Sequence, residues 1–516
     1  MALKTFAAID VGSYELEMKI FEISGKKGMK QIEDIRSSLD LGSETYLTER
    51  VSYEKVEELC KILREFKLIM KSYQVSEYRA YGTSAVRETR NTRILLDQIA
   101  QRTGIQVEVL SNSEQRFLDY KSVAVMSEDF NRMLTGDGET AIVDIGGGSI
   151  QLSLFEGGSL VSSQNLKLGV LRVQEYLNQL DAGAMKTEGL VDEIMQAQLE
   201  VFKKLYLKDR KIQNIIIIDD YLSVVLQKPV ETDMKPGFIR AETFERFMDS
   251  IKTKKITEIA ESLSVSEENA MLLFISSVML QKIRIMMGAK IMWAPGVTLC
   301  DGIAYEYAEK NKIIHVEHDF EADILSSAEN ISRRYMGSRK RSETLSAIAM
   351  TLFDSVKKIH GMGKRERLLL QLSAILHDCG KYVSMVFLGE CSYNIIMSTE
   401  IIGISHRERE MVANIVKYNH LPFEYYEEIK NKTTLDLQAY LTIAKLTAIL
   451  RIANGLDRSH KQKFKDIKVV LRDDVLEIMV DTEDDITLEK GLFKQRTDFF
   501  EEVFNIRPVI KQKRSF

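Results

Sequence analysis

Two short segments of the chain place a carboxylate, glycines and a hydroxyl directly after an apolar run. The first reads Asp10-Val-Gly12-Ser13, and the second reads Asp144-Ile-Gly146-Gly147-Gly148-Ser149. Glycines allow consecutive backbone N–H groups to approach an anion closely, because no Cβ stands in the way. A carboxylate at the end of the apolar run can hold Mg²⁺ or water. The pattern indicates a phosphate cradle in which Asp10 and Asp144 bind the metal.

The spacing of the two segments carries more weight than either segment alone. A single Asp-x-Gly-Ser turn is typical of an ordinary hairpin. Asp10 and Asp144, however, are 134 residues apart, so the motif recurs about one domain length later. This recurrence predicts two related lobes that face each other. The expected phosphate ligands are Asp10, Gly12, Ser13, Gly146, Gly147, Gly148 and Ser149.

Hydrophobic periodicity indicates the elements that must position these turns. Helical periods cover residues 54–68 and 91–102, and residues 107–110 are typical of a strand, so the first lobe is α/β. After the second turn, the pattern predicts a helix near 190–208, a strand at 214–218 and a glycine-containing turn at 294–297. From about residue 317 to about 464 only helical periods remain, and residues 467–471 and 475–480 then predict a small hairpin.

The length of 516 residues implies several domains, because about 100–200 residues usually form one. We predict boundaries near residues 124, 312 and 463. The expected parts are an α/β lobe at 1–124, a second α/β lobe at 125–312, an all-helical domain at 313–463 and a small α+β segment at 464–516.

Composition and charge narrow the class of protein. Hydrophobic residues make up 45% and charged residues 28%, which is typical of a soluble globular chain. A net charge of −5 argues against broad electrostatic binding of nucleic acid. The chain shows no signal-peptide pattern, and its apolar stretches at 215–218 and 441–452 fall short of the ~18 residues that span a bilayer.

Cysteine usage points to the compartment. Cys60, Cys300, Cys379 and Cys391 lie far apart without paired metal-ligand spacing, which predicts buried reduced thiols. We therefore expect a cytoplasmic protein with no membrane partner. A homodimer is compatible with the sequence, which does not fix the oligomeric state.

Several further motifs occur in an order that resembles the exopolyphosphatase/guanosine pentaphosphate phosphatase (Ppx/GppA) family. Besides the two glycine turns, they are Gly82-Thr-Ser84-Ala-Val-Arg87 with Asn91, Leu118-Asp-Tyr120, Leu168-Gly169-Val-Leu-Arg172 and Gly296-Val-x-Leu299-x-x-Gly302. The helical part adds Leu376-His377-Asp378-x-Gly380-Lys381 and Arg451-Ile-Ala-x-x-Leu456-Asp457-Arg-Ser-His460, which resemble the HD-type domain of some members. The resemblance covers nearly the whole chain.

The resemblance implies two actin-like (ribonuclease H-like) lobes with a cleft between them that binds a phosphate chain. Family members cleave the terminal phosphate of inorganic polyphosphate or the 5′-γ phosphate of guanosine pentaphosphate, with Mg²⁺. Arg87 would then contact the departing phosphate. An Arg suits this role because its planar fork pairs with two phosphate oxygens.

The chain departs from the family at the residues that would activate water. The family's catalytic glutamate falls at Gln115 in an ungapped alignment, and a shift of one residue would restore Glu114. A second family glutamate, after the second glycine turn, is here Gln151. An amide has nearly the shape of a carboxylate, but it accepts no proton at neutral pH and binds a hard cation more weakly. These changes argue against fast hydrolysis.

Three further residues, at two places in the sequence, also differ from the family. Tyr14 stands where the family usually has Asn. Asp219 and Asp220 replace a loop that is usually rich in Gly and Thr, and their charges would repel a polyphosphate unless a cation bridges them. Alternatively, the two aspartates cap the next helix.

The HD-like part lacks one expected ligand. His377, Asp378 and Asp457 match the pattern, but residues 342–344, where a metal-binding His is expected, are Ser-Glu-Thr. We therefore expect His377 and Asp378 to be a structural remnant that hydrogen-bonds between helices.

Two hypotheses retain the phosphate-binding cleft. In the first, the protein is a hydrolase of polyphosphate or guanosine pentaphosphate, slowed by Gln115 and Gln151. Arg87 would contact the departing phosphate beside Gln115, and Glu114 or a Mg²⁺-bound water would compensate for the missing base. In the second, it binds the same ligands without cleaving them and acts as a regulator. A sugar kinase or ATPase of the same fold would additionally need a nucleoside pocket.

Overall fold

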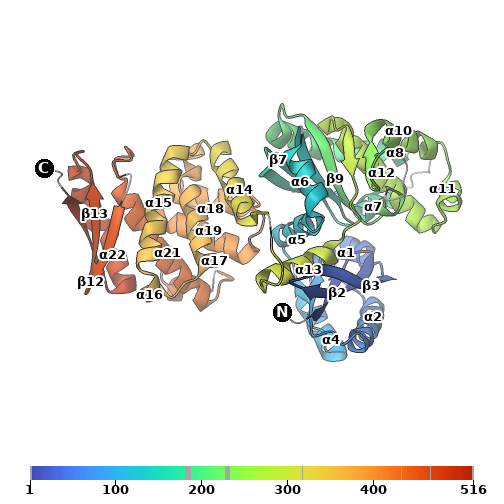
Figure 1. Cartoon of the computed structure of the whole chain (residues 1–516), viewed down its shortest axis with the longest axis horizontal. Helices are drawn as coiled ribbons and strands as arrows, with labels where there is room; N and C mark the ends of the chain where they lie inside the picture. The colour runs from blue at the N-terminus through green and yellow to red at the C-terminus, as the bar shows by residue number, and fades with distance from the viewer. Residues whose placement is uncertain are drawn as a thin grey trace. The chain divides into compact units, whose positions relative to one another are not determined.

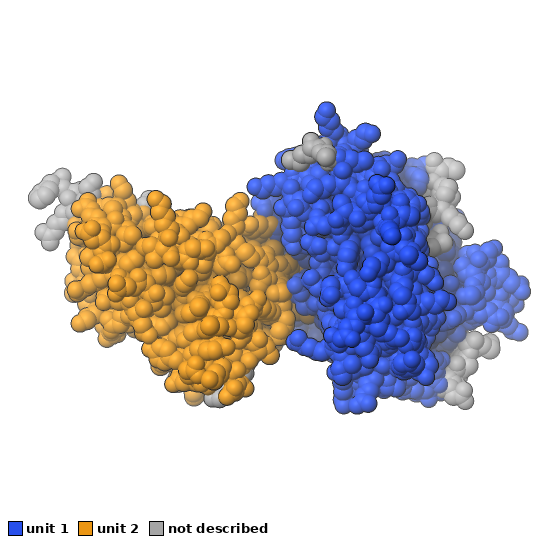
Figure 2. Space-filling model, turned by 90° about the horizontal axis from the view of Figure 1, so that it is seen from below, with its two compact units in different colours: residues 1–320 blue, residues 321–516 orange. Residues whose placement is uncertain are grey.

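The computed structural model describes residues 3–136, 138–180, 187–226, 233–316, 318–431, 433–464 and 467–513. The chain divides into two compact units, unit 1 at residues 1–320 and unit 2 at residues 321–516 (Figure 2). The finer boundaries expected near residues 124 and 463 stay predictions.

Two mixed sheets form the framework of unit 1. The first has the strand order β3-β2-β1-β4-β5, with β1 (Lys4–Val11), β2 (Glu15–Ser24), β3 (Gly28–Ser38), β4 (Glu77–Gly82) and β5 (Glu108–Val109). The second has the order β10-β11-β9-β6-β7-β8, with β6 (Glu139–Ile145), β7 (Ile150–Glu156), β8 (Ser159–Leu166), β9 (Ile212–Asp219), β10 (Phe238–Arg240) and β11 (Ile291–Trp293).

The two sheets repeat one arrangement around their central strands. β1 is antiparallel to β2 and parallel to β4, and β6 is antiparallel to β7 and parallel to β9. Each predicted glycine turn therefore connects a central strand to its antiparallel neighbour. This repeated arrangement confirms the expected α/β fold of unit 1 and matches the recurrence of the glycine turn.

Helices cover both sheets of unit 1. They are α1 (Gly42–Thr48), α2 (Tyr53–Ser72), α3 (Ser84–Glu88), α4 (Thr92–Thr103), α5 (Asn112–Ala124), α6 (Ser127–Thr135), α7 (Val170–Gln179), α8 (Thr187–Phe202), α9 (Ser223–Leu226), α10 (Ala241–Lys252), α11 (Ile256–Leu263), α12 (Glu267–Met287) and α13 (Leu299–Lys310). A π-helical turn at Lys203–Leu207 extends α8. The expected helices at 54–68, 91–102 and 190–208 are thus confirmed.

The alternation of side chains along β1 explains how this strand is buried on both faces. Ala7, Ile9 and Val11 join a core with α2 and α4, whereas Phe6 and Ala8 pack with Leu299 and Ile303 of α13. Figure 1 shows α2 and α4 on one side of the first sheet and α13 on the other. The end of β1 is therefore held rigidly where the first glycine turn begins.

Helix α12 is longer than the apolar stretches at 215–218 and 441–452. By length and composition alone, it could cross a membrane. In the structure, 72% of its most apolar 18-residue window is buried inside the fold. Leu272, Ile275 and Met279 belong to the core beside the second sheet. The expectation that no stretch reaches the length of a membrane span was wrong, and α12 packs as a core helix.

Unit 2 begins with helices and ends with a small sheet. The helices are α14 (Phe320–Arg334), α15 (Arg339–Ser355), α16 (Lys357–His360), α17 (Lys364–Ile375), α18 (Leu388–Ser398), α19 (His406–His420), α20 (Tyr426–Ile429), α21 (Leu437–Leu456) and α22 (Thr487–Phe504), with a 3₁₀ turn at Cys379–Tyr382. The sheet order is β12-β13-β14, with β12 (Ile467–Arg472), β13 (Val475–Asp481) and β14 (Arg507–Lys513). The predicted hairpin is confirmed, because β12 and β13 are antiparallel and Arg472 pairs with Val475.

The cysteines are free thiols in the structure. Cys60, Cys300 and Cys379 are buried as expected, whereas Cys391 is partly exposed.

Candidate active site

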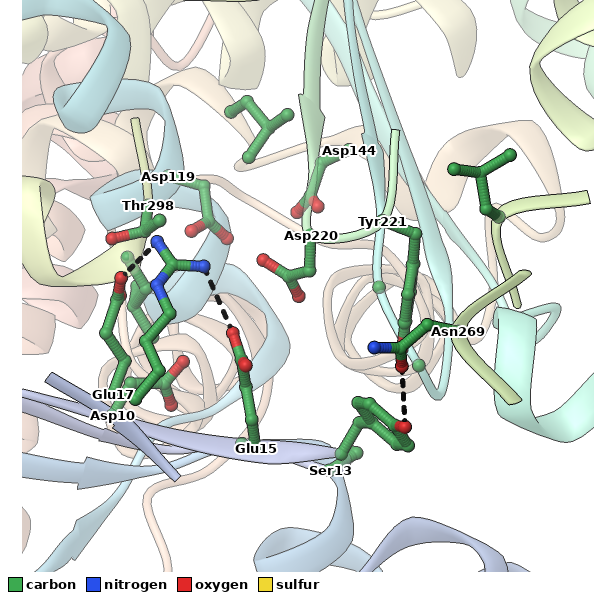
Figure 3. Close-up of a pocket in the computed structure, with 18 of the residues that line it drawn as sticks. Asp10, Ser13, Glu15, Glu17, Asp119, Asp144, Asp220, Tyr221, Asn269 and Thr298 are labelled. Atoms are coloured by element: carbon green, nitrogen blue, oxygen red, sulfur yellow. Dashed lines mark hydrogen bonds and ion pairs between the residues drawn. The ribbon is translucent and has the colours of Figure 1, made fainter. Parts of the chain in front are cut away.

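A cavity of about 300 Å³ lies in unit 1 where the two glycine turns meet. Both lobes line it, and Figure 3 shows carboxylates from several elements pointing into it. Of the predicted site residues, the lining includes Asp10, Gly12, Ser13, Gln115, Asp144, Gly146 and Gly147. The other predicted residues of unit 1 that the structure describes lie outside this lining: Arg87, Glu114, Gly148 and Ser149.

The two glycine turns have the same hairpin geometry. Gly12 N donates to Glu15 O at 3.1 Å, and Gly146 N donates to Ser149 O at 3.0 Å. A Cβ on Gly12 would lie 2.6 Å from Glu15 O, so a side chain could not fit there. A Cβ on Gly147 would lie 3.2 Å from Ser13 Cβ, which shows that the two turns approach each other closely.

Tyr46 of α1 connects the two turns. Its hydroxyl is 2.8 Å from Ser13 Oγ and 2.7 Å from Ser84 Oγ, and it lies against the backbone of Gly148. The guanidinium of Arg172 lies over its ring, 4.2 Å from the centroid. Gly148 therefore faces Tyr46, and no motif in the sequence indicated this contact.

Four aspartates converge on the cavity: Asp10 at the end of β1, Asp119 on α5, Asp144 at the end of β6 and Asp220 after β9. Burial and neighbouring negative charges raise the pKa of Asp10 and of Asp119 well above the ordinary range. Burial, followed by repulsion from Asp220, raises the pKa of Asp144 to about 7. The carboxyl groups of Asp119 and Asp144 also interact with each other, and the charge of Asp144 raises the pKa of Asp119 further.

The aspartate oxygens suit a hard divalent cation. Asp10 Oδ1 and Asp119 Oδ2 are buried and have no hydrogen-bond partner among the described residues. Across those same residues, no three His, Cys, Asp or Glu side chains form a ready metal site. Mg²⁺ tolerates this, because it often uses one or two carboxylates and takes its other ligands from water and substrate phosphates.

Arg36 of β3 is the cation in the cavity lining. Its Nη2 is 2.6 Å from Glu17 Oε1, and its Nη1 is 3.2 Å from Glu15 Oε1 (Figure 3). Burial, followed by the charge of Asp220, raises the pKa of Glu15 to about 7. Arg36, Glu15 and Glu17 were not predicted, because they come from strands whose residues carry no recognisable motif.

Helix α5 separates the roles of Glu114 and Gln115. The Glu114 carboxylate accepts hydrogen bonds from Ser111 N at 3.0 Å and Ser111 Oγ at 2.6 Å, which completes a capping box at the start of the helix. Gln115 lines the cavity one turn before Asp119, and Arg87 Nη1 donates to Gln115 Oε1 at 3.3 Å. This geometry favours the ungapped alignment, in which Gln115 takes the catalytic position.

Gln151 of β7 is outside the cavity lining. It pairs with Asp144 across β6 and β7, and it is 4% exposed. Its Oε1 has no hydrogen-bond partner within the described part of the chain.

Of Asp219 and Asp220, one caps the next helix and the other faces the cavity, so each of the two expected roles is taken by one residue. Asp219 Oδ1 accepts a hydrogen bond from Tyr221 N at 2.6 Å and another from Leu222 N, and Ser276 Oγ donates to Asp219 Oδ2. Asp219 therefore caps the turn before α9, whereas Asp220 lines the cavity.

The raised pKa values lead to a prediction about stability and pH. Asp10, Asp119, Asp144 and Glu15 hold protons in the folded state that the unfolded chain has already released above about pH 4. The free energy of unfolding without metal should therefore fall as pH rises from about 4 through about 7. Mg²⁺ should offset more of this loss at about pH 8 than at about pH 5, because it competes with the protons.

Urea unfolding at several pH values, with EDTA or with excess Mg²⁺, measures this linkage. A stability that rises with pH in EDTA would contradict it.

In unit 2, the three residues of the HD-like pattern lie together around an arginine. His377 Nε2 is 3.7 Å from Asp378 Oδ2, while Arg341 of α15 has Nη1 3.8 Å from Asp378 Oδ2 and Nε 3.4 Å from Asp457 Oδ2. Arg341 Nη2 also donates to Asn454 Oδ1 at 2.9 Å. Arg341 thus contributes the positive charge that the two buried carboxylates need.

His377 is neutral in this cluster. Its Nδ1 donates to Ala374 O at 2.8 Å, and His420 Nε2 donates to His377 O at 2.7 Å. Burial lowers the pKa of His377 to about 3. The bond from His420 joins the end of α17 to α19 through the backbone of His377, whereas the His377 side chain bonds within its own helix end, so the structural remnant stays a prediction.

Comparison with known proteins matches most of unit 1 and most of unit 2 to one family. Residues 19–311 match the family model "Ppx/GppA phosphatase family", and residues 325–497 match the family model "Ppx/GppA phosphatase, domain III". A guanosine-5′-triphosphate,3′-diphosphate pyrophosphatase of Vibrio atlanticus is 22% identical over 461 residues, which cover 87% of this chain and 85% of the relative. The protein of the same name from Photobacterium profundum is 20% identical over 473 residues, covering 89% and 88%.

Solved structures show the same fold. A Ppx/GppA family member of Aquifex aeolicus has a TM-score of 0.50 at 18% identity and covers 62% of this chain and 100% of its own. An exopolyphosphatase of Cytophaga hutchinsonii has a TM-score of 0.50 at 16% identity and covers 61% and 100%.

Proposed function

Because the chain belongs to the Ppx/GppA phosphatase family, we propose that the cavity of unit 1 binds a chain of phosphates and releases its terminal phosphate by hydrolysis. The substrate class is inorganic polyphosphate or guanosine pentaphosphate, in line with the names of the exopolyphosphatase and pyrophosphatase relatives. The observation that carries this proposal is the convergence of both glycine turns, with Asp10 and Asp144, on one cavity.

The residues of the cavity have separate tasks in this proposal. Asp10 and Asp144 would hold Mg²⁺, with Asp119 and Asp220 beside them. When bound, Mg²⁺ would offset the charge of the phosphates and of these carboxylates. Gln115 can orient a water molecule through its amide, but it cannot take a proton from it. We therefore expect slow turnover.

Binding without cleavage is the second candidate function. It is favoured by Gln115, an amide in the cavity at the position of the family's catalytic carboxylate, while Glu114 caps a helix. A protein of this kind would report the level of its ligand to a partner.

One experiment separates the two functions. Phosphate release from long-chain polyphosphate and from guanosine pentaphosphate is measured with Mg²⁺, beside retention of the same ligands on filters. Release with binding supports the hydrolase, and binding alone supports the regulator. If the protein neither binds nor cleaves either ligand, both functions are excluded.

Arg87→Ala is expected to weaken the binding of tripolyphosphate by about tenfold, because hydrogen bonds to charged groups are worth ~1.5–3 kcal/mol. Arg87 donates a hydrogen bond from Nη1 to Gln115, which lines the cavity, and the same Nη1 donates to Leu110 O at 2.8 Å. Arg90→Ala is the matched control, because the Arg90 side chain is 72% exposed. Calorimetry gives the two dissociation constants, and an unchanged value for Arg87→Ala would exclude Arg87 from phosphate binding.

A further inference from the structure

One side of the cavity has no task in the handling of phosphates. Figure 3 shows Tyr221 and Asn269 on one side of the cavity and Asp10 and Glu17 on the other. The side with Tyr221 and Asn269 also includes apolar side chains that pack with one core: Val225 of α9, Leu263 of α11, Val265 of the three-residue connection between α11 and α12, and Leu273 of α12. Inorganic polyphosphate has no apolar group that would gain from contact with these side chains.

Two tyrosines form aromatic walls in this part of the cavity. The ring centroids of Tyr14 and Tyr221 are 6.1 Å apart, and their planes are tilted by 56°. Tyr14 Oη donates to Asn269 Oδ1 at 2.8 Å, which holds the Tyr14 ring against the lobe that carries α12. Tyr14 follows the first glycine turn directly, so an aromatic group bound here would be attached to phosphates at that turn by a short connection.

The two sides together fit a ligand with a phosphate chain at one end and a planar base at the other. The carboxylate side requires a cation, which phosphates bring with them as their magnesium complex. The tyrosine side offers stacking surface, which favours a nucleobase whatever its hydrogen-bonding edge. The cavity of about 300 Å³ lies at the lower end of the range for ligand pockets, so it suits one nucleotide.

We propose that Tyr14, Tyr221 and Asn269 form a nucleobase subsite, so that this cavity takes nucleoside 5′-polyphosphates in preference to inorganic polyphosphate. The inference rests on the proposed function, because it assigns the phosphates to the glycine turns. Tyr14 is a specificity-determining residue in this assignment. It contacts the base through its ring and is held by Asn269.

Calorimetry with paired probes tests the subsite. The probes are non-hydrolysable analogues of GTP and ATP and inorganic tripolyphosphate, each with Mg²⁺, because they share a triphosphate and differ in the nucleoside. The full-length chain should bind at least one of the nucleotides more than about tenfold more tightly than tripolyphosphate. One stacked base is worth ~5–150-fold in affinity.

Variants of Tyr14 separate stacking from hydrogen bonding. Tyr14→Ala should lose ~5–150-fold in nucleotide affinity while its affinity for tripolyphosphate stays the same. Tyr14→Phe should keep most of the nucleotide affinity, because the ring remains and only the bond to Asn269 is lost. Tyr53→Ala is the control, since Tyr53 is 69% exposed at the start of α2. Circular dichroism verifies that each variant is folded.

The outcomes distinguish failure of the subsite from failure of the proposed function. The subsite is wrong, and the phosphate site stands, if two results occur together. Tripolyphosphate binds as tightly as both nucleotides, and Tyr14→Ala leaves the affinities for the three probes unchanged or lowers all three equally. If the native chain binds no probe at all, the proposed function is wrong and the subsite with it. A preference for the ATP analogue, with phosphate release from ATP, keeps the subsite but moves the activity toward an ATPase.

Discussion

Gln115→Glu combined with Gln151→Glu is expected to raise phosphate release by ~10²–10⁴-fold, the usual contribution of a general base. Gln115 is the more important of the two, because it lines the cavity and Gln151 does not. A carboxylate at position 115 would lie beside Arg87, whose Nη1 is 3.3 Å from Gln115 Oε1. This cation should keep the new carboxylate ionised and able to accept a proton from water.

Gln151→Glu acts through the metal side of the site. Gln151 is opposite Asp144, and a carboxylate there would be buried among groups that already repel one another. Without Gln115→Glu, the new carboxylate should either hold a proton or raise the Mg²⁺ concentration that is needed for activity. It should increase the rate of phosphate release only when a cation is bound. The single change Gln115→Glu should therefore recover part of the rate, and the double change should recover more at high Mg²⁺.

Glu114→Gln is the matched control for this pair of changes. The Glu114 carboxylate caps α5, so its loss should cost about 1 kcal/mol of stability and leave the rate constant for phosphate release almost unchanged. Steady-state rates with guanosine pentaphosphate and polyphosphate decide the matter. If Glu114→Gln abolishes native activity, Glu114 is the base and the ungapped alignment is wrong. If the double variant binds ligand without cleaving it, the regulatory function is favoured.

Sequence patterns of a few adjacent residues predicted the strands and turns that form from neighbouring residues. The strands before Asp10 and Asp144 and the hairpin at 467–480 follow from apolar runs that end in turn residues. The pairing of β1 and β6 with corresponding neighbours follows from the recurrence of the glycine turn. These features need only a few adjacent residues, and therefore periodicity and spacing suffice.

The remaining site residues depend on contacts between distant segments. Asp119 could have been found, because it follows Gln115 by four residues and so shares its helix face. Tyr46, Arg36 and Arg341 could not, because each acts through partners on other elements and carries no motif of its own. Polar residues of this kind look like ordinary surface residues until the tertiary structure surrounds them with partners.

Arg341→Met is expected to lower the free energy of unfolding by ~3–5 kcal/mol, because removing one partner of a buried ion pair leaves the other charge uncompensated. The side chains of Arg341, Asp378 and Asp457 are only 6%, 5% and 2% exposed. Asp378 retains Lys381 Nζ at 3.2 Å, so Asp457 should account for most of the loss. Met fills a similar volume, so that the loss reflects charge rather than a cavity.

A surface arginine on the same helix is the matched control for this substitution. Arg339 is the first residue of α15 and pairs with Glu343 at 2.8 Å, but its side chain is 80% exposed. Arg339→Ala should therefore cost no more than about 0.5 kcal/mol. Urea unfolding followed by circular dichroism compares the two variants at equal protein concentration.

Removal of the carboxylates distinguishes an internal ion pair from a site with chemistry. Arg341→Met combined with Asp378→Asn and Asp457→Asn should recover much of the lost stability, because no buried charge then lacks a partner. The same triple variant, like His377→Ala with Asp378→Ala, should retain whatever phosphate release the native chain has, since the cavity with Asp10 and Asp144 lies in unit 1. If the triple variant is stable but phosphate release is lost, the cluster around Arg341 contributes to the reaction, and its assignment as a structural remnant is wrong.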